Sequence, residues 1–134
     1  MPVLQGQSSK WSGGALLVWR ATTDARDRDE NLAVHDVKRG VHRGYRLSFP
    51  DATIVHIWDV ASNAGTVAVA GQAINAAGAF VGFFALNSTK SEGVNVVQTS
   101  PFEPQRIVFG SDSTIWVLGF QLGEGRQVHR LTPC

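Results

Sequence analysis

A chain of 134 residues with 43% hydrophobic and 17% charged side chains is long enough for one domain with its own core, and this composition favours folding over disorder. The formal net charge is +1, from 12 basic and 11 acidic residues. It offers no electrostatic reason to bind nucleic acid or an anionic membrane surface, so we expect neither partner.

No cellular compartment follows from the sequence. The N-terminal stretch MPVLQGQSSKW lacks a basic segment followed by an apolar one, and no apolar run approaches the roughly 20 residues of a membrane span. The single cysteine, Cys134, has no partner for an intramolecular disulfide, so the redox compartment stays undetermined.

Short runs rich in Val, Ile, Phe and Trp alternate along the chain with Gly, Asn, Asp, Ser and Pro, a pattern typical of strands and turns. No window shows a sustained helical period with caps. We therefore expect an all-β protein. The predicted strands, in chain order, are Ala15–Ala21, Asn31–Val37, Gly44–Ser48, Thr53–Val60, Thr66–Ile74, Ala79–Leu86, Val94–Thr99, Arg106–Phe109, Thr114–Gln121 and Gln127–Leu131.

Three markers indicate an internal repeat of about four short strands, and one of them is the strand ends Val37, Leu86 and Leu131, which lie 49 residues (37 to 86) and 45 residues (86 to 131) apart. Ala15, Thr66 and Thr114 begin similar strands that lie 51 residues (15 to 66) and 48 residues (66 to 114) apart. FPDATIV at Phe49 and FEPQRIV at Phe102 also match, 53 residues apart (49 to 102). The repeat divides the single predicted domain, 1–134, into units of approximately 1–48, 49–101 and 102–134.

Several predicted strands are apolar or small on both faces, among them TVAVAGQA, AFVGFFAL and TIWVLGF. A sheet with two apolar faces needs a neighbour on each side. Four-stranded sheets repeated around an axis meet that need. The sequence therefore predicts a partial β-propeller of about two and a half to three four-stranded antiparallel blades.

The stretch SPFEPQRIVFGSDSTIWVLG, from Ser100 to Gly119, resembles the blade junctions of NHL-like and gluconolactonase-like propellers, and DVASNAGTVAVAGQA, from Asp59 to Ala73, is similar. These are strand and turn motifs, so the resemblance implies a fold and not a chemistry. An alternative is a WD-repeat propeller, because Trp58-Asp59 follows apolar residues, but this dipeptide occurs once.

The predicted blades do not complete a ring, since propellers typically have 4 to 8 blades. Two explanations stay open: the chain is a fragment of a longer propeller, or it is a partial propeller that associates with itself through open terminal blades. An inner strand for the first blade would have to come from Pro2–Gly6. We also expect Val67, Val69, Phe83, Ile115 and Val117 to be buried and Trp116 to pack between adjacent sheets.

The gluconolactonase-like resemblance implies acidic and amide side chains around a central divalent metal. In the predicted layout only Asp51, Asn75 and Glu103 reach the matching mouth, and they are the candidate ligand-binding residues; turn residues with local hydrogen bonds are the competing interpretation. We predict no catalytic residue, no metal site and no cofactor.

Other polar features favour structural roles. The charged stretch Thr22–Asn31 alternates in sign, as a solvated hairpin does. Two alternatives are a loop that binds a partner protein and, because of its aspartates, a calcium site. His35 and His129 occupy equivalent strand positions, which favours packing or surface roles, and Ser12–Gly14 is typical of a turn.

From the sequence we expect a non-catalytic β-propeller scaffold that presents a loop-built face to a protein or small-molecule ligand. The alternative is part of a metal-dependent lactonase or hydrolase propeller. Fold alone does not separate them, because one architecture carries many functions.

Overall fold

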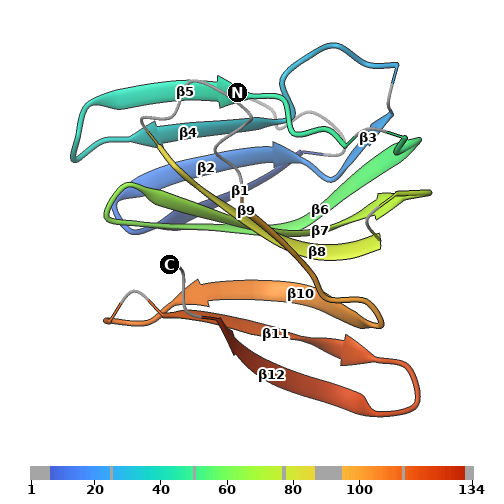
Figure 1. The fold of residues 1–134 in the computed structure, drawn as a ribbon. Coiled ribbons are helices and arrows are strands. Elements are labelled where there is room, and N and C mark those ends of the chain that lie inside the picture. Colours follow the sequence, from blue (N-terminus) through green and yellow to red (C-terminus); the bar gives the residue numbers. More distant parts are fainter. Residues whose placement is uncertain are drawn as a thin grey trace.

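The computed structural model describes residues 7–24, 26–49, 51–76, 78–86, 95–112 and 114–131. Within these ranges the chain forms three antiparallel sheets stacked in layers (Figure 1). The N-terminal sheet has the strand order β1-β2-β4-β5, the middle sheet β3-β6-β7-β8-β9 and the C-terminal sheet β10-β11-β12. The all-β prediction is confirmed, and none of these sheets closes on itself in the described part. No helix in that part is long and apolar enough to cross a membrane.

The strands are short and are joined mostly by tight turns. Their bounds are β1 (Gln7–Ser12), β2 (Ala15–Arg20), β3 (Thr22–Asp24), β4 (Leu32–Asp36), β5 (Val41–Tyr45), β6 (Ile54–Asn63), β7 (Thr66–Ile74), β8 (Gly78–Ala85), β9 (Asn95–Gln98), β10 (Phe102–Phe109), β11 (Ile115–Gln121) and β12 (Gly125–Leu131).

Apolar runs predicted the central strands well, and the prediction for Thr66–Ile74 coincides with β7. The strand predicted at Gly44–Ser48 lies instead at Val41–Tyr45, because pairing with β4 resumes directly after the turn at 37–40, from Asp36 opposite Val41. The proposed inner strand Pro2–Gly6 lies outside the described residues.

Two strands escaped prediction. β1, with the sequence QSSKWS, is too polar to show a hydrophobic pattern, yet it pairs along its whole length with β2. β3 is only three residues long, shorter than any periodic signal can reveal.

β3 also links two sheets. The chain leaves β2, passes Ala21 and pairs with the open edge of β6, where Thr22 lies opposite His56 and the Ile57 N–H donates to the Ala21 carbonyl at 3.0 Å. The prediction that Thr22–Asn31 is simply a solvated hairpin is therefore wrong at its start. An unpaired sheet edge leaves backbone groups unsatisfied, and β3 satisfies part of that edge.

Two hydrophobic clusters hold the layers together. One lies between the N-terminal and middle sheets and includes Leu17, Val34 and Val67; the other lies between the middle and C-terminal sheets and includes Ala68 and Val117. Strand β7 contributes to both because successive side chains of a strand point to opposite faces. The middle sheet is therefore apolar on both sides, as the sequence predicts.

Four of the residues predicted to be buried are buried, namely Val67, Val69, Ile115 and Val117. Phe83 is partly buried against the second cluster.

The prediction for Trp116 is wrong. Its side chain is 39% exposed, because it alternates with Ile115 and Val117 and so points away from the middle sheet. The C-terminal sheet has a neighbouring sheet on one side only among the described residues (Figure 1). Trp116 lies on the other side, opposite in direction to Ile115 and Val117.

Candidate functional site

Strands β1, β6 and β10, one from each sheet, meet at a buried carboxylate. Asp59 of β6 is 7% exposed. The Lys10 ammonium of β1 donates to its Oδ1 at 3.3 Å and its Oδ2 at 3.2 Å, and the Ile107 N–H of β10 donates to Oδ2 at 2.9 Å. The same ammonium donates to the Ile107 carbonyl oxygen at 3.2 Å. Hydrogen bonds between charged groups are among the stronger ones in proteins, so one ion pair ties all three sheets together.

A β-bulge positions this carboxylate. The pairing of β6 with β7 shifts between Ile57 and Asp59, which leaves Trp58 as the extra residue. Gly71 lies opposite, where a Cβ would overlap with the His56 carbonyl oxygen. A bulge bends a strand and redirects its side chains. Here it turns Asp59 toward β10, while Val60 resumes packing against the N-terminal sheet.

The C-terminal sheet repeats this local arrangement. In β10 the pairing shifts between Pro104 and Arg106, so Gln105 is the bulged residue. Gly119 of β11 lies opposite, where a Cβ would overlap with the Glu103 carbonyl oxygen. The two bulges place Trp58 and Gln105 along the same open groove.

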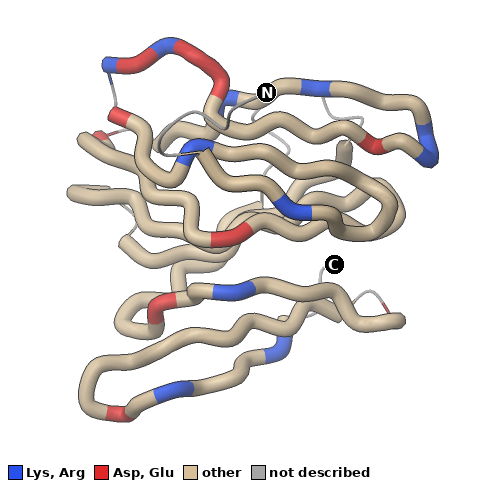
Figure 2. Tube along the Cα trace, turned by 180° about the vertical axis from the view of Figure 1, so that it is seen from behind, with Lys and Arg blue, Asp and Glu red and all other residues tan. Residues whose placement is uncertain are grey.

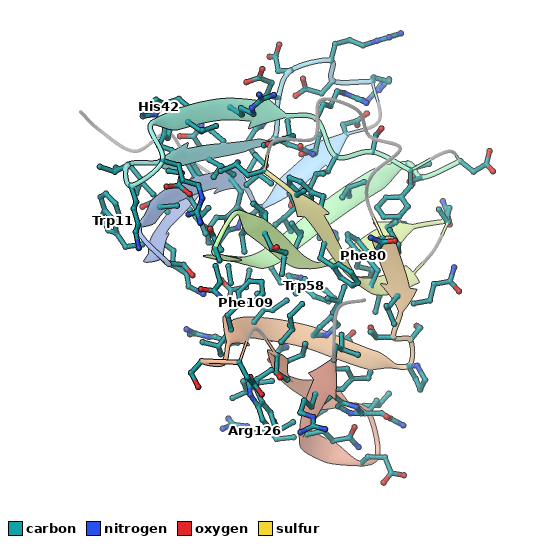
Figure 3. The ribbon with its side chains drawn as sticks, turned by 60° about the vertical axis from the view of Figure 1, so that its left-hand side comes forward. Trp11, His42, Trp58, Phe80, Phe109 and Arg126 are labelled. Carbon is teal, nitrogen blue, oxygen red and sulfur yellow. The ribbon has the colours of Figure 1, made fainter. Side chains whose placement is uncertain are left out.

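This junction groove has a volume of about 600 Å³ and is lined by Ser8, Ser9, Lys10, Trp19, Trp58, Asp59, Gln105 and Arg106. Trp19 is 5% exposed and supports the wall, whereas Trp58 is half-buried and offers part of its ring to the groove. Figure 3 shows Trp58 on the middle sheet, at the level where that sheet approaches the C-terminal one. The lining therefore combines indole surface with hydroxyl, amide and cationic groups.

Three charged groups of the described lining set the electrostatics of the groove. Lys10 and Asp59 neutralise one another across 3.2 Å. Arg106 is exposed and forms no ion pair among the described residues. The lining thus keeps one positive charge that a ligand can meet, and its carboxylate is already occupied.

Two of the predicted ligand-binding residues lie at one end of the middle sheet. Asp51 and Asn75 both have positive φ, 70° and 64°, a conformation that Asn and Asp tolerate in turns. The Asn75 side-chain amide donates to the Thr53 Oγ1 at 3.3 Å. Ala52, next to Asp51, lines a second cavity of about 290 Å³ together with Thr23.

The third predicted residue, Glu103, lies in β10 of the C-terminal sheet, opposite Phe120. Among the described residues, no hydrogen bond or ion pair joins it to Asp51 or Asn75. The structure therefore brings Asp51 and Asn75 to the same end of one sheet and leaves Glu103 on another.

The charged loop that follows β3 uses its carboxylates locally. The Arg20 guanidinium pairs with Asp27 and lowers the pKa of that carboxyl, and the backbone N–H of Asp29 assists. Arg26 likewise forms an ion pair with Asp24 and lowers the pKa of the Asp24 carboxyl. Arg46 anchors the loop by donating to the Asp27 carbonyl at 2.9 Å. Figure 2 shows these alternating charges at one corner of the molecule.

The histidines form pairwise contacts. His35 and His42 face one another across β4 and β5, with their Nδ1 atoms 3.0 Å apart. The His129 ring contacts the Phe102 ring at a tilt of 44°, with ring centroids 4.2 Å apart. In the described part of the chain, no three His, Cys, Asp or Glu side chains gather where they could hold a metal ion.

Comparison of the chain with protein-family models, with curated proteins and with solved structures found no match. The resemblance of Ser100–Gly119 to NHL-like propellers accordingly stays a prediction.

Sequence reasoning missed most of the groove. Ser8, Ser9 and Lys10 sit in a polar strand that carries no pattern, and Gln105 and Arg106 follow a proline in an ordinary strand. One signal is present in the sequence, the Trp58-Asp59 dipeptide, whose interpretation as a repeat marker does not include a buried charge. An acidic residue inside an apolar strand is rarely buried without a partner. That rule predicts a cationic partner for Asp59 but cannot identify Lys10.

Proposed function

We propose that this chain is a non-catalytic scaffold of the β-propeller type that binds a small organic anion in the junction groove. The observation that carries the proposal is the groove lining, in which a half-buried tryptophan and an arginine without an ion pair among the described residues lie beside hydroxyl and amide groups. Asp59, the carboxylate in the described lining, is already bound to Lys10 and Ile107.

The stacking of the sheets supports the propeller type. Apart from β3, which pairs with the open edge of β6, the strands of the three antiparallel sheets follow one another in chain order. Strands β1, β6 and β10 converge on one region, as inner strands do around a propeller axis. The paired bulges opposite Gly71 and Gly119 support a common local design for two of the sheets.

The lining favours a ring that bears hydroxyl groups and one carboxylate. The indole of Trp58 offers a flat apolar surface, while the serine hydroxyls and the Gln105 amide can both donate and accept hydrogen bonds. The Arg106 guanidinium is a planar donor suited to a carboxylate. A uronic acid combines these features, so glucuronate is the probe that we choose.

The test is a titration of the chain with glucuronate, followed by tryptophan fluorescence and calorimetry, with glucose as the neutral counterpart. We expect glucuronate to bind and Arg106→Gln to weaken it by about tenfold or more, because one charge-assisted contact is lost. Arg126→Gln, a matched change of an exposed arginine outside the groove lining, should leave the affinity unchanged. Equal binding of glucose and glucuronate would contradict the proposal, as would no binding at millimolar concentration.

Titration with calcium, zinc and magnesium separates this proposal from a metal-dependent lactonase or hydrolase. A stoichiometric cation site that is lost in Asp51→Asn or Glu103→Gln would favour the enzyme. The predicted ligand-binding residues would then be ligands of that cation.

A further inference from the structure

The three sheets are stacked in one direction. In β7 of the middle sheet, Val67 and Val69 pack toward the N-terminal sheet, and Ala68 and Ala70 pack toward the C-terminal sheet. In β11 the corresponding residues Ile115 and Val117 pack back toward the middle sheet. Each sheet thus has a rear side, toward the preceding sheet, and a forward side, toward the next one.

The forward face of the C-terminal sheet is apolar at its centre and uncovered by any described residue. Cross-strand register places Val108 beside Trp116 and Leu118 beside Val128, with exposed fractions of 48%, 39%, 40% and 61%. A cluster of exposed apolar side chains on one flat sheet is typical of an interaction surface. The middle sheet carries Ala68 on its own forward side, and there the C-terminal sheet packs against it. The forward face of the C-terminal sheet is the equivalent side.

The rim of this forward face carries more arginines than carboxylates. Arg130 lies opposite Trp116 and Arg126 opposite Phe120, and neither forms an ion pair among the described residues. Glu103 of β10 also lies opposite Phe120 and shares this face, while Asp112 and Glu124 lie in the turns. Figure 3 shows Arg126 at the outer end of the stack.

The rear face of the N-terminal sheet is the opposite end of the stack. Trp11 is 65% exposed and lies beside Leu16, and Val18 lies beside Ala33. These side chains alternate with Ala15 and Leu17, which pack on the middle sheet. In Figure 3, Trp11 projects away from the sheets.

This rear face carries a carboxylate. Gly44, opposite Ala33, shares the face, and a Cβ there would overlap with the Glu30 carboxylate. Glu30 therefore lies over the sheet at Gly44, and it is exposed without an ion pair among the described residues. A like-to-like contact of two forward faces would place arginines against arginines, whereas forward against rear places them toward a carboxylate.

We propose that two copies of this chain assemble head to tail, with the forward face of the C-terminal sheet of each copy packed on the rear face of the N-terminal sheet of the other. The contact continues the stacking direction already present within the chain. Two copies then give a closed ring of six sheets, within the 4 to 8 blades of known propellers. A head-to-tail contact closes when its rotation completes a ring and otherwise forms filaments. This inference rests on the propeller arrangement in the proposed function but not on its ligand.

Light scattering coupled to gel filtration, together with sedimentation velocity, tests the full chain at micromolar concentration. We expect the mass of a dimer. Leu118→Glu blocks the forward face and Val18→Glu the rear face, so each variant alone should be monomeric, with association weakened by about tenfold or more. Leu122→Glu is the matched control, because Leu122 is 87% exposed in the β11–β12 turn and should leave the dimer intact.

Mixing the two blocked variants distinguishes a head-to-tail contact from a symmetric one. Val18→Glu keeps its forward face and Leu118→Glu keeps its rear face, so an equimolar mixture should regain dimers through one intact contact. A combined Arg126→Glu and Arg130→Glu variant changes only exposed side chains, and its dimer should also dissociate. This variant keeps the test valid if Leu118→Glu or Val18→Glu fails to fold.

A monomeric parent chain would overturn the proposal and would assign the forward face to a different partner. Growing polymers would overturn ring closure, and failure of the mixture to form dimers would overturn the head-to-tail contact. A monomer that still binds glucuronate would leave the proposed function standing, so the two proposals fail separately.

Discussion

Strands β7 and β11 have related sequences, TVAVAGQAI and TIWVLGFQ counted from Thr66 and Thr114, but they lie in different surroundings. The third residue of each stretch is Ala68, fully buried, and Trp116, 39% exposed. Both point to the forward side of their sheets. The middle sheet meets a neighbour there, and the C-terminal sheet meets none among the described residues. A strand pattern thus sets which way a side chain points, while the number of neighbouring sheets decides whether it is covered.

The small forward residues of the middle sheet have a packing reason. Ala61, Ala68 and Ala70 leave room for Ile107 and Ile115 of the C-terminal sheet. The forward face of the C-terminal sheet carries larger side chains instead, so a sheet that covers it must approach from farther away or supply small residues of its own.

The largest difference should come from two tryptophans. Trp19→Ala removes an indole that is 5% exposed, and such truncations cost about 3–5 kcal/mol of unfolding free energy. Trp116→Ala removes a partly exposed one, and we expect a loss of about 1 kcal/mol or less. Urea unfolding at low protein concentration measures both, and similar losses for the two variants would contradict the difference in burial.

A matched pair within β11 sharpens the comparison between the two sides of one sheet. Ile115 is fully buried against the middle sheet and Leu118 is 40% exposed. Ile115→Ala should cost about 2–5 kcal/mol, and Leu118→Ala roughly 0.5–1 kcal/mol, as read from thermal and urea unfolding. If Leu118→Ala were the more damaging change in a monomeric sample, the forward face could not be uncovered.

Substitutions of two aspartates compare the stability contributed by a carboxylate of the middle sheet with that of a carboxylate in a turn of the C-terminal sheet. Asp59→Ala leaves the Ile107 N–H and the Lys10 ammonium without their acceptor, and lost hydrogen bonds to a charged group cost about 1.5–3 kcal/mol. Asp112→Ala removes exposed turn contacts, among them the hydrogen bond from the Thr114 N–H at 3.1 Å and the attraction to Arg130, and should shift the unfolding midpoint less. Equal shifts would mean that the carboxylate does not join the sheets.

The smallest expected effect is the pH dependence of stability that comes from the loop after β3. Arg20 lowers the pKa of Asp27, so the folded state holds its charged form more strongly than the unfolded chain does. The stabilisation is present above the ordinary carboxyl pKa of about 3.9 and is lost as the pH falls through the lowered value. Asp27→Asn should therefore lower the melting temperature at neutral pH and have little effect at strongly acidic pH. An unchanged gap between variant and parent across the pH range would show that the pair adds nothing.

The sequence by itself determined the all-β class and most strand positions, since the alternation of apolar runs with turn residues is a local signal. It also determined that β7 is apolar on both faces. It could not reveal β1 or β3, because a polar strand and a three-residue strand exist only through hydrogen bonds to distant partners. For the candidate site, residue types at Asp51 and Asn75 located turns, and Asp59 signalled a buried charge. The groove itself was decided by tertiary structure: Lys10, Asp59 and Ile107 meet only because the three sheets stack with β1, β6 and β10 together. Trp116 shows the same limit, since side-chain alternation fixes direction within a strand and only the packing of whole sheets decides what lies in that direction.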